Sequence, residues 1–166
     1  EAEFEVEMSK QRERARVAHE TIDLTVQGSL DTLAESINVT EFVGYTQPVA
    51  TAKVEVLLVD GQSVEQVEAG KDVQIVLDTT PFYAESGGQI GDRGYISGDA
   101  VLVRVEDVKK ESDFFVHFGR IERGTLRVGD TVTAQIDSGC RRRAQANHTA
   151  THLLQAALRK IVDPTI

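Results

Sequence analysis

Residues 126–132 read Leu126-Arg-Val-Gly-Asp-Thr-Val132, with apolar and polar residues alternating on either side of a Gly-Asp pair. Alternation with a period of two is typical of a half-buried strand, and Gly next to Asp favours a tight turn. The Gly-Asp pair therefore predicts a turn, followed by the strand that begins at Thr131. Other short β-branched runs predict further strands: Ala52 to Val59, Val73 to Leu77, Val101 to Val105, Phe114 to Ile121 and Thr131 to Ile136.

Turn signals separate these runs at close spacing, with no helical pattern between them. They are Asp60-Gly61, Ala69-Gly70, Ser97-Gly98-Asp99, Arg123-Gly124 and Gly129-Asp130. Short strands joined by tight turns predict a small β-barrel over residues 39–137. The 126–132 element also resembles a strand-turn-strand element in the second-domain barrels of translation factors, a common pattern that supports the fold more than a function.

Helical segments are expected on both sides of the barrel, which makes the fold class mainly β with flanking helices. Residues 1–38 contain the charge-dense run Lys10-Gln-Arg-Glu-Arg-Ala-Arg16, which favours a helix. Its apolar residues are sparse, so it either packs against a missing partner or is a solvated, frayed end. Residues 138–166 return to helical periodicity from Arg141 to Val162, and Asp163-Pro164 ends the helix. An apolar face with so little to cover it suggests a truncated chain.

Composition indicates a globular protein of one domain, or a small domain with an appended helix: 166 residues, 40% of them hydrophobic. The single cysteine, Cys140, excludes an internal disulfide, and no apolar stretch reaches the roughly 18 residues of a membrane span. We therefore expect an intracellular protein, cytoplasmic or organellar, that does not bind membranes.

The net charge and the local distribution of charge give opposite indications about nucleic-acid binding. The formal charge of −9 argues against binding a polyanion. Between Cys140 and Lys160, however, there is no acidic residue, and Arg141, Arg142 and Arg143 form a cationic patch. The patch either faces nucleic-acid phosphates or merely keeps the end of a helix soluble.

His148-Thr-Ala-Thr-His152 places two imidazoles four residues apart, on adjacent turns of the predicted helix and opposite its apolar face. Two such nitrogens can meet one metal ion, although a polar helix face holding two histidines by chance is the alternative. Cys140 lies about two turns away and is expected to be a packing residue. The metalloprotease motif is excluded because Thr149 occupies the position that requires Glu.

A second unusual stretch runs from Asp78 to Asp92 and contains three glycines, which permit close backbone approach to a partner. It lacks the features of a phosphate-binding or dinucleotide-binding loop, and a barrel corner is the simpler interpretation. Glu85 and Asp92 could form an acid–base pair, but neither has a visible partner, and surface carboxylates are the simpler expectation. His117, in a predicted strand, is expected to be an ordinary structural residue.

Together, Thr80-Pro-Phe-Tyr-Ala-Glu-Ser-Gly-Gly-Gln-Ile-Gly-Asp92 and Asn147-His-Thr-Ala-Thr-His-Leu-Leu154 resemble, in order and separation, segments of the alanine–tRNA ligase family and its free-standing editing relatives. The opening Phe4 to Arg16 resembles the helix that ends the tRNA-recognition region of the ligases, which favours the ligase over a free-standing hydrolase. The last helix would then open the α+β editing core.

The resemblance implies a zinc site with His148 and His152 as ligands, and a substrate pocket involving Thr151, Gly87 and Gly88. The other zinc ligands, from a later Cys-x-x-x-His segment, and the ATP-binding core are absent from this sequence. No catalytic site is therefore complete, and the piece alone is expected to be nearly inactive. The implied partners are the acceptor end of tRNA(Ala), bound near Arg141 to Arg143, and the rest of the ligase. The alternative is a non-catalytic barrel that binds RNA or a partner.

Overall fold

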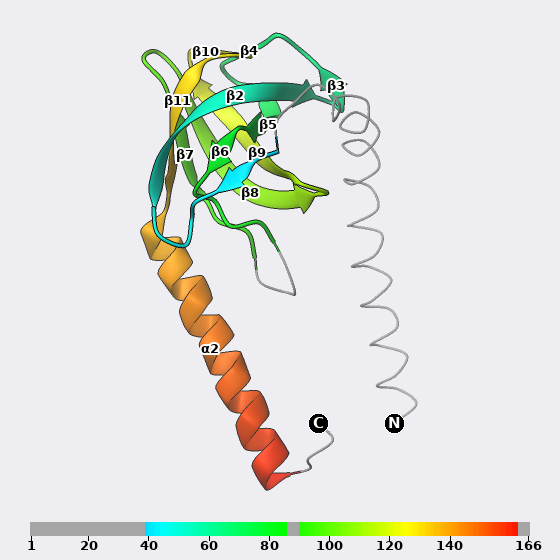
Figure 1. The fold of residues 1–166 in the computed structure, drawn as a ribbon, viewed down its shortest axis with the longest axis vertical. Coiled ribbons are helices and arrows are strands. Elements are labelled where there is room, and N and C mark those ends of the chain that lie inside the picture. The colour runs from blue at the N-terminus through cyan, green and yellow to red at the C-terminus, as the bar shows by residue number, and fades with distance from the viewer. Residues whose placement is uncertain (1–38, 86–89, 163–166) are drawn as a thin grey trace.

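A computed structural model describes residues 39–85 and 90–162 of the chain (Figure 1). The helix expected within residues 1–38 lies outside the described residues. The described part consists of a closed barrel of six strands, several two- or three-residue strands around it, and one long helix that leaves the barrel at its end. The prediction of a mainly β fold with a β-barrel and a helix after it is confirmed.

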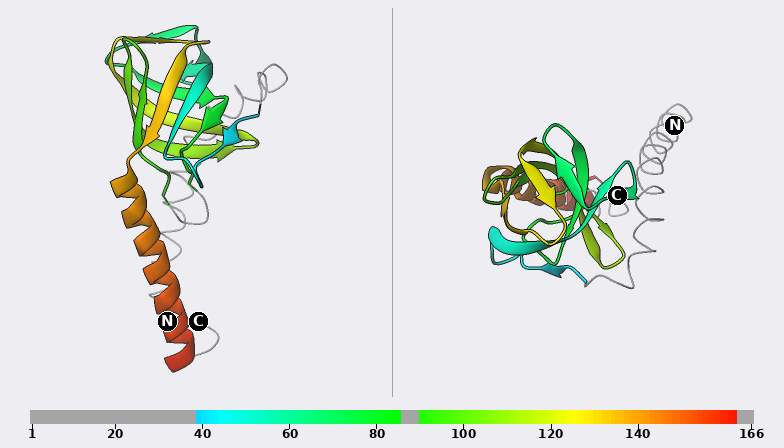
Figure 2. Two further views of the ribbon diagram at one scale, coloured as in Figure 1. Left: turned by 60° about the vertical axis from the view of Figure 1, so that its left-hand side comes forward. Right: turned by 90° about the horizontal axis from the view of Figure 1, so that it is seen from above.

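The barrel is antiparallel throughout, and its strands follow the order β2, β5, β9, β8, β7, β11, after which β11 pairs with β2 and closes the ring (Figure 2). Each predicted strand corresponds to one of these, and β7 is the one barrel strand that was not predicted. The bounds are β2 (Val49–Val59), β5 (Asp72–Leu77), β7 (Gly94–Ser97), β8 (Leu102–Glu111), β9 (Phe114–Arg123) and β11 (Thr131–Ile136).

Shorter strands form pairings outside the ring of six. β1 (Glu41–Phe42) pairs in parallel with β6 (Thr79–Thr80), β3 (Gln62–Ser63) pairs with β2, and β4 (Gln66–Glu68) pairs with β10 (Thr125–Arg127). The 126–132 stretch contains the predicted turn, with a strand on either side of it. Gly129 has a φ of 89°, and an Asp130 carboxylate oxygen accepts the Arg127 N–H at 2.9 Å, which closes the turn between β10 and β11.

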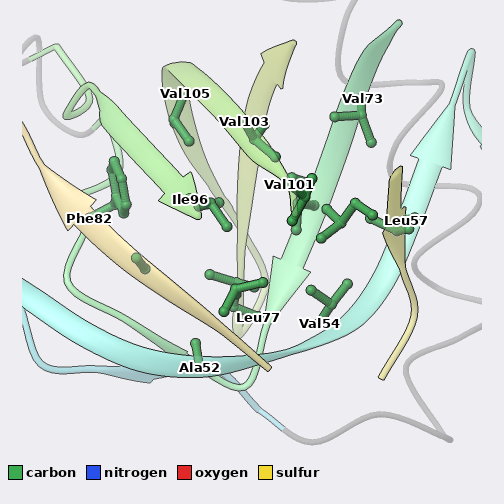
Figure 3. Close-up of a cluster of buried hydrophobic side chains, with 14 of the residues drawn as sticks. Ala52, Val54, Leu57, Val73, Leu77, Phe82, Ile96, Val101, Val103 and Val105 are labelled. Atoms are coloured by element: carbon green, nitrogen blue, oxygen red, sulfur yellow. The ribbon is translucent and has the colours of Figure 1, made fainter. Parts of the chain in front are cut away.

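Aliphatic side chains from all six strands fill the barrel interior (Figure 3). Burial alternates from Val49 to Val54 in β2, as expected for a strand with one face turned inward, and Val56, Leu57 and Leu58 are then buried in succession. Val54, Leu57, Leu77 and Ile96 are fully buried, as is Phe82, which lies in the loop after β6. Phe82 thus anchors the first part of the 78–92 segment in the barrel core.

Helix α2 (Ser138–Ile161) follows β11 after a single residue, Asp137, whose carboxylate accepts the N–H groups of Gly139 at 2.8 Å and Cys140 at 3.0 Å. These bonds satisfy orphan donors of the first turn. The hydrogen bond from the Cys140 N–H is the main reason that the pKa of Asp137 lies below its usual range. This cap starts the helix three residues before the predicted Arg141.

β7 and β11 pack closely against each other at the end of the barrel where α2 begins. At Gly94, an added Cβ would lie 2.1 Å from the Gln135 carbonyl oxygen and 2.8 Å from the Ile136 Cα, so only glycine lets β7 approach β11 there. Beyond this point α2 contributes no buried residue, and Leu153, Leu154 and Ile161 are all exposed. No helix within residues 39–85 and 90–162 combines the length and apolarity needed to cross a bilayer.

Candidate functional site

The two histidines of α2 meet on one face of the helix. His148 Nε2 and His152 Nε2 lie 2.9 Å apart, and the ring centroids are 4.4 Å apart at an interplanar angle of 79°. Both side chains are exposed. The four-residue spacing therefore places two imidazole nitrogens side by side and accessible from outside.

The arrangement fits half of a zinc site. Two nitrogens that each bind one tetrahedral zinc ion at about 2.0–2.1 Å lie about 3.3 Å apart, close to the separation seen here. Catalytic zinc usually takes three protein ligands, and the described residues contain no group of three or more metal-ligating side chains. Cys140 does not join the pair, because its thiol hydrogen-bonds to Asp137 at 3.2 Å and accepts from Arg143 at 2.9 Å.

Of the residues expected around a substrate pocket, Thr151 is on α2 one position before His152. Its hydroxyl donates to the Asn147 carbonyl oxygen at 2.9 Å, and its side chain is exposed. The hydroxyl oxygen keeps a lone pair for a further donor. Gly87 and Gly88 lie outside the described residues.

The three arginines of the expected cationic patch have different surroundings. Arg142 and Arg143 are exposed at the start of α2. Arg141 is instead turned toward the loops at one end of the barrel, where its guanidinium donates to the carbonyl oxygens of Gly44 at 2.5 Å and Pro81 at 2.8 Å, and pairs with Asp92. An exposed phosphate contact is thus open to Arg142 and Arg143, while the donors of Arg141 are engaged.

Asp92 is not the surface carboxylate that the sequence suggested, because it is only 7% exposed. Its two oxygens accept the Arg141 Nε at 3.1 and 3.0 Å, and its Oδ2 also accepts the Tyr83 N–H at 2.7 Å. Glu85 is exposed as expected. Asp92 and Arg141 are 49 residues apart, so no local pattern could have paired them.

A fully buried histidine supports the start of the same segment. His117 Nδ1 donates to the Ile75 carbonyl oxygen at 2.9 Å, which leaves Nε2 to accept the Thr80 hydroxyl at 2.7 Å. The Thr80 oxygen in turn accepts the Phe82 N–H at 3.1 Å. Burial lowers the pKa of His117 to about 4. The ring is therefore neutral and structural, as expected.

Comparison with known proteins identifies the family. A model described as class II (A) tRNA synthetases matches residues 1–140, which is most of the chain. The chain therefore belongs to the class II (A) tRNA synthetase family. The matched range covers the barrel and ends before the histidine pair.

Individual relatives match almost the whole chain, including α2, and they are all of one kind within the family. The alanine–tRNA ligase of Trichormus variabilis is 80% identical over 163 residues, covering 98% of this chain and 18% of that protein. The alanine–tRNA ligase of Nostoc punctiforme is 78% identical with the same coverage. That of Synechococcus elongatus is 72% identical over 165 residues, or 99% of the chain. The chain thus spans about a fifth of the length of these relatives, 18–19%.

Proposed function

We propose that this chain is the part of an alanine–tRNA ligase that carries the barrel and first helix of its editing region. In the full ligase this region hydrolyses tRNA(Ala) mischarged with serine or glycine. The observation that supports it is the exposed His148 and His152 pair, whose Nε2 atoms converge to 2.9 Å. High identity to alanine–tRNA ligases across 98% of the chain supports the same assignment.

A ligase specific for alanine has a physical reason to need a second, hydrolytic site. A missing methyl group lowers binding by only about 1–3 kcal/mol, so an alanine pocket discriminates poorly against glycine. A hydrophobic pocket also rejects an added hydroxyl poorly, so serine is admitted too. A separate site that hydrolyses the ester of Ser-tRNA(Ala) or Gly-tRNA(Ala) removes these products. It thereby restores the accuracy of tRNA charging that the alanine pocket alone does not supply.

The histidine pair would hold a zinc ion together with ligands from outside these residues. Zinc supplies Lewis-acid polarisation of a carbonyl or a bound water, or orients the substrate. The Thr151 hydroxyl lies on the flank of the same helix and can hydrogen-bond to a serine hydroxyl. Because only two ligands are present, this chain alone should bind zinc weakly and show little hydrolysis.

The proposed partner is the acceptor end of tRNA(Ala). Exposed Arg142 and Arg143 at the start of α2 would contribute a salt-dependent phosphate contact. The net charge of −9 makes a broad, non-specific RNA surface a poor alternative. In the full ligase, attachment of alanine with ATP takes place in a region outside this chain.

Thr151→Val in the full-length ligase should slow hydrolysis of Ser-tRNA(Ala) by about tenfold, because one neutral hydrogen bond of about 1–1.5 kcal/mol is lost. Alanine attachment should remain at the wild-type rate. Rates of deacylation and of alanine attachment, measured on the same preparations, check this.

Thr149→Val is the matched control, because Thr149 makes the same type of bond to the carbonyl oxygen four residues before it, at 2.9 Å to Gln145. It lies about 160° around the helix axis from Thr151, on the other flank of the histidine pair. Equal slowing by both variants would show that helix packing, not serine recognition, is being measured. Unchanged deacylation in Thr151→Val would contradict its role in the pocket.

A further inference from the structure

Arg141 connects α2 to two separate parts of the barrel. Its Nη1 donates to the Gly44 carbonyl oxygen at 2.5 Å, and its Nη2 donates to the Pro81 carbonyl oxygen at 2.8 Å. The Nε donates to both carboxylate oxygens of Asp92. The arginine side chain is 16% exposed and the aspartate side chain 7%. All three guanidinium nitrogens are therefore engaged at a largely buried position.

Asp92 also holds the two ends of the 81–92 loop together. Besides Arg141, its carboxylate accepts the Tyr83 N–H at 2.7 Å, and its own N–H donates to the Tyr83 carbonyl oxygen at 2.9 Å. The described ends of this loop descend from the barrel on the side where α2 begins (Figures 1 and 2). One ion pair thus joins the closed neck of the loop to the first turn of α2.

Arg141 lies on the same face of α2 as the two histidines. Seven residues separate Arg141 from His148, and at about 100° per residue they differ by only about 20° around the helix axis. His152 falls within about 20° of Arg141 on the other side. The face of α2 that Arg141 anchors to the loop is therefore the face that carries the imidazole pair.

We propose that Arg141 and Asp92 form a clamp that sets the rotation of α2 about its axis, so that His148 and His152 stand on the side where residues 81–85 and 90–92 leave the barrel. This inference rests on the proposed editing function, in which Arg141 is a positioning residue. α2 buries none of its residues in the barrel, and the Asp137 cap bonds only to N–H groups of the helix itself, whereas the Arg141 bonds reach Gly44, Pro81 and Asp92. A planar guanidinium bound on several edges resists rotation, whereas an ammonium group does not.

Arg141→Lys in the full-length ligase is the test, because it keeps the charge and removes the fixed geometry. Deacylation of Ser-tRNA(Ala) should fall by about 10–100-fold in kcat, as for other residues that orient metal ligands, with KM and alanine attachment unchanged. Asp92→Asn should have the same effect. Amide hydrogen exchange should accelerate in residues 81–85, 90–93 and 138–147 but not in the barrel strands.

Two control variants separate positioning from other roles. Arg120→Lys makes the same change at an exposed arginine of β9, which pairs with Asp72 at 3.5 Å and does not contact α2, and it should leave kcat and hydrogen exchange at wild-type values. Val103→Ala lowers stability in the barrel core, away from the clamp, and should not change deacylation below its melting temperature. If Arg141 bound phosphate instead, Arg141→Lys would raise KM and change the salt dependence of binding, and that result would overturn the clamp.

Failure of the clamp and failure of the proposed function give different results. Wild-type kcat in Arg141→Lys, together with faster exchange in residues 138–147, would show that the clamp exists but does not position the site, and would overturn the inference. A wild-type ligase that does not hydrolyse Ser-tRNA(Ala) would overturn the proposed function. The orientation of α2 would then be judged by hydrogen exchange alone, and unchanged exchange in Arg141→Lys would overturn the clamp as well.

Discussion

Replacing either His148 or His152 by alanine in the full-length ligase should reduce hydrolysis of Ser-tRNA(Ala) by at least about 100-fold, and alanine attachment should continue at the wild-type rate. Changing a residue that merely supports a metal ligand typically costs about 10–100-fold, so loss of a ligand should cost more. The two Nε2 atoms are 2.9 Å apart, so each variant leaves a single imidazole where two converged. Single-turnover deacylation and steady-state alanine attachment measure the two rates separately.

Gln155→Ala is a suitable control, because Gln155 is exposed on the same polar face of α2 but has no metal-binding nitrogen. It should retain wild-type hydrolysis. The double variant should be no worse than either single one, since the two histidines would act on one ion. Equal loss of hydrolysis and alanine attachment would count against a separate editing site.

Acidification from pH 6.5 to pH 4 should lower the free energy of unfolding of the chain by about 3 kcal/mol through His117 alone. Burial lowers the pKa of His117 from 6.5 to about 4 in the folded state, so in this window the unfolded chain binds a proton that the folded chain does not. The contribution of His117 to the free energy of unfolding is therefore fully present above pH 6.5 and is lost as the pH falls toward 4. Denaturant titrations at several pH values measure it.

His117→Asn isolates this contribution from that of the carboxylates. Asparagine can still donate to the Ile75 carbonyl oxygen but does not titrate and leaves the Thr80 hydroxyl without its acceptor. The variant should be about 1–3 kcal/mol less stable at pH 7. The difference from the wild-type chain should shrink as the pH falls. Parallel pH profiles for the two chains would show that His117 does not titrate in this way.

Local patterns were sufficient for most of the barrel strands. β11 was predicted with its observed bounds, since β-branched residues alternate between the core and the surface along it. β7 was missed because it is only four residues long, Gly-Tyr-Ile-Ser. Its burial alternates in the structure, but its hydropathy does not, since the buried Gly94 has no side chain and the aromatic Tyr95 is exposed. The order of the strands could not be predicted from a single sequence, because β7 pairs with β11, which is far along the chain.

The candidate site was predictable to the extent that it depends on one helix. A four-residue spacing brings two imidazoles together in any α-helix, and the structure places His148 and His152 as expected. The ion pair between Arg141 and Asp92 could not be predicted without the three-dimensional structure. Arginine beside two other arginines suggests an exposed patch, and only the fold shows that the first turn of α2 directs Arg141 toward Gly44 and Pro81.

The central claim is that His148 and His152 are two ligands of one zinc ion in the full-length ligase. Metal content per chain, measured by mass spectrometry after dialysis, tests it directly. We expect the wild-type ligase to retain one more zinc per chain than the His148→Ala/His152→Ala variant, with both proteins folded. The same zinc content in both proteins would contradict the claim.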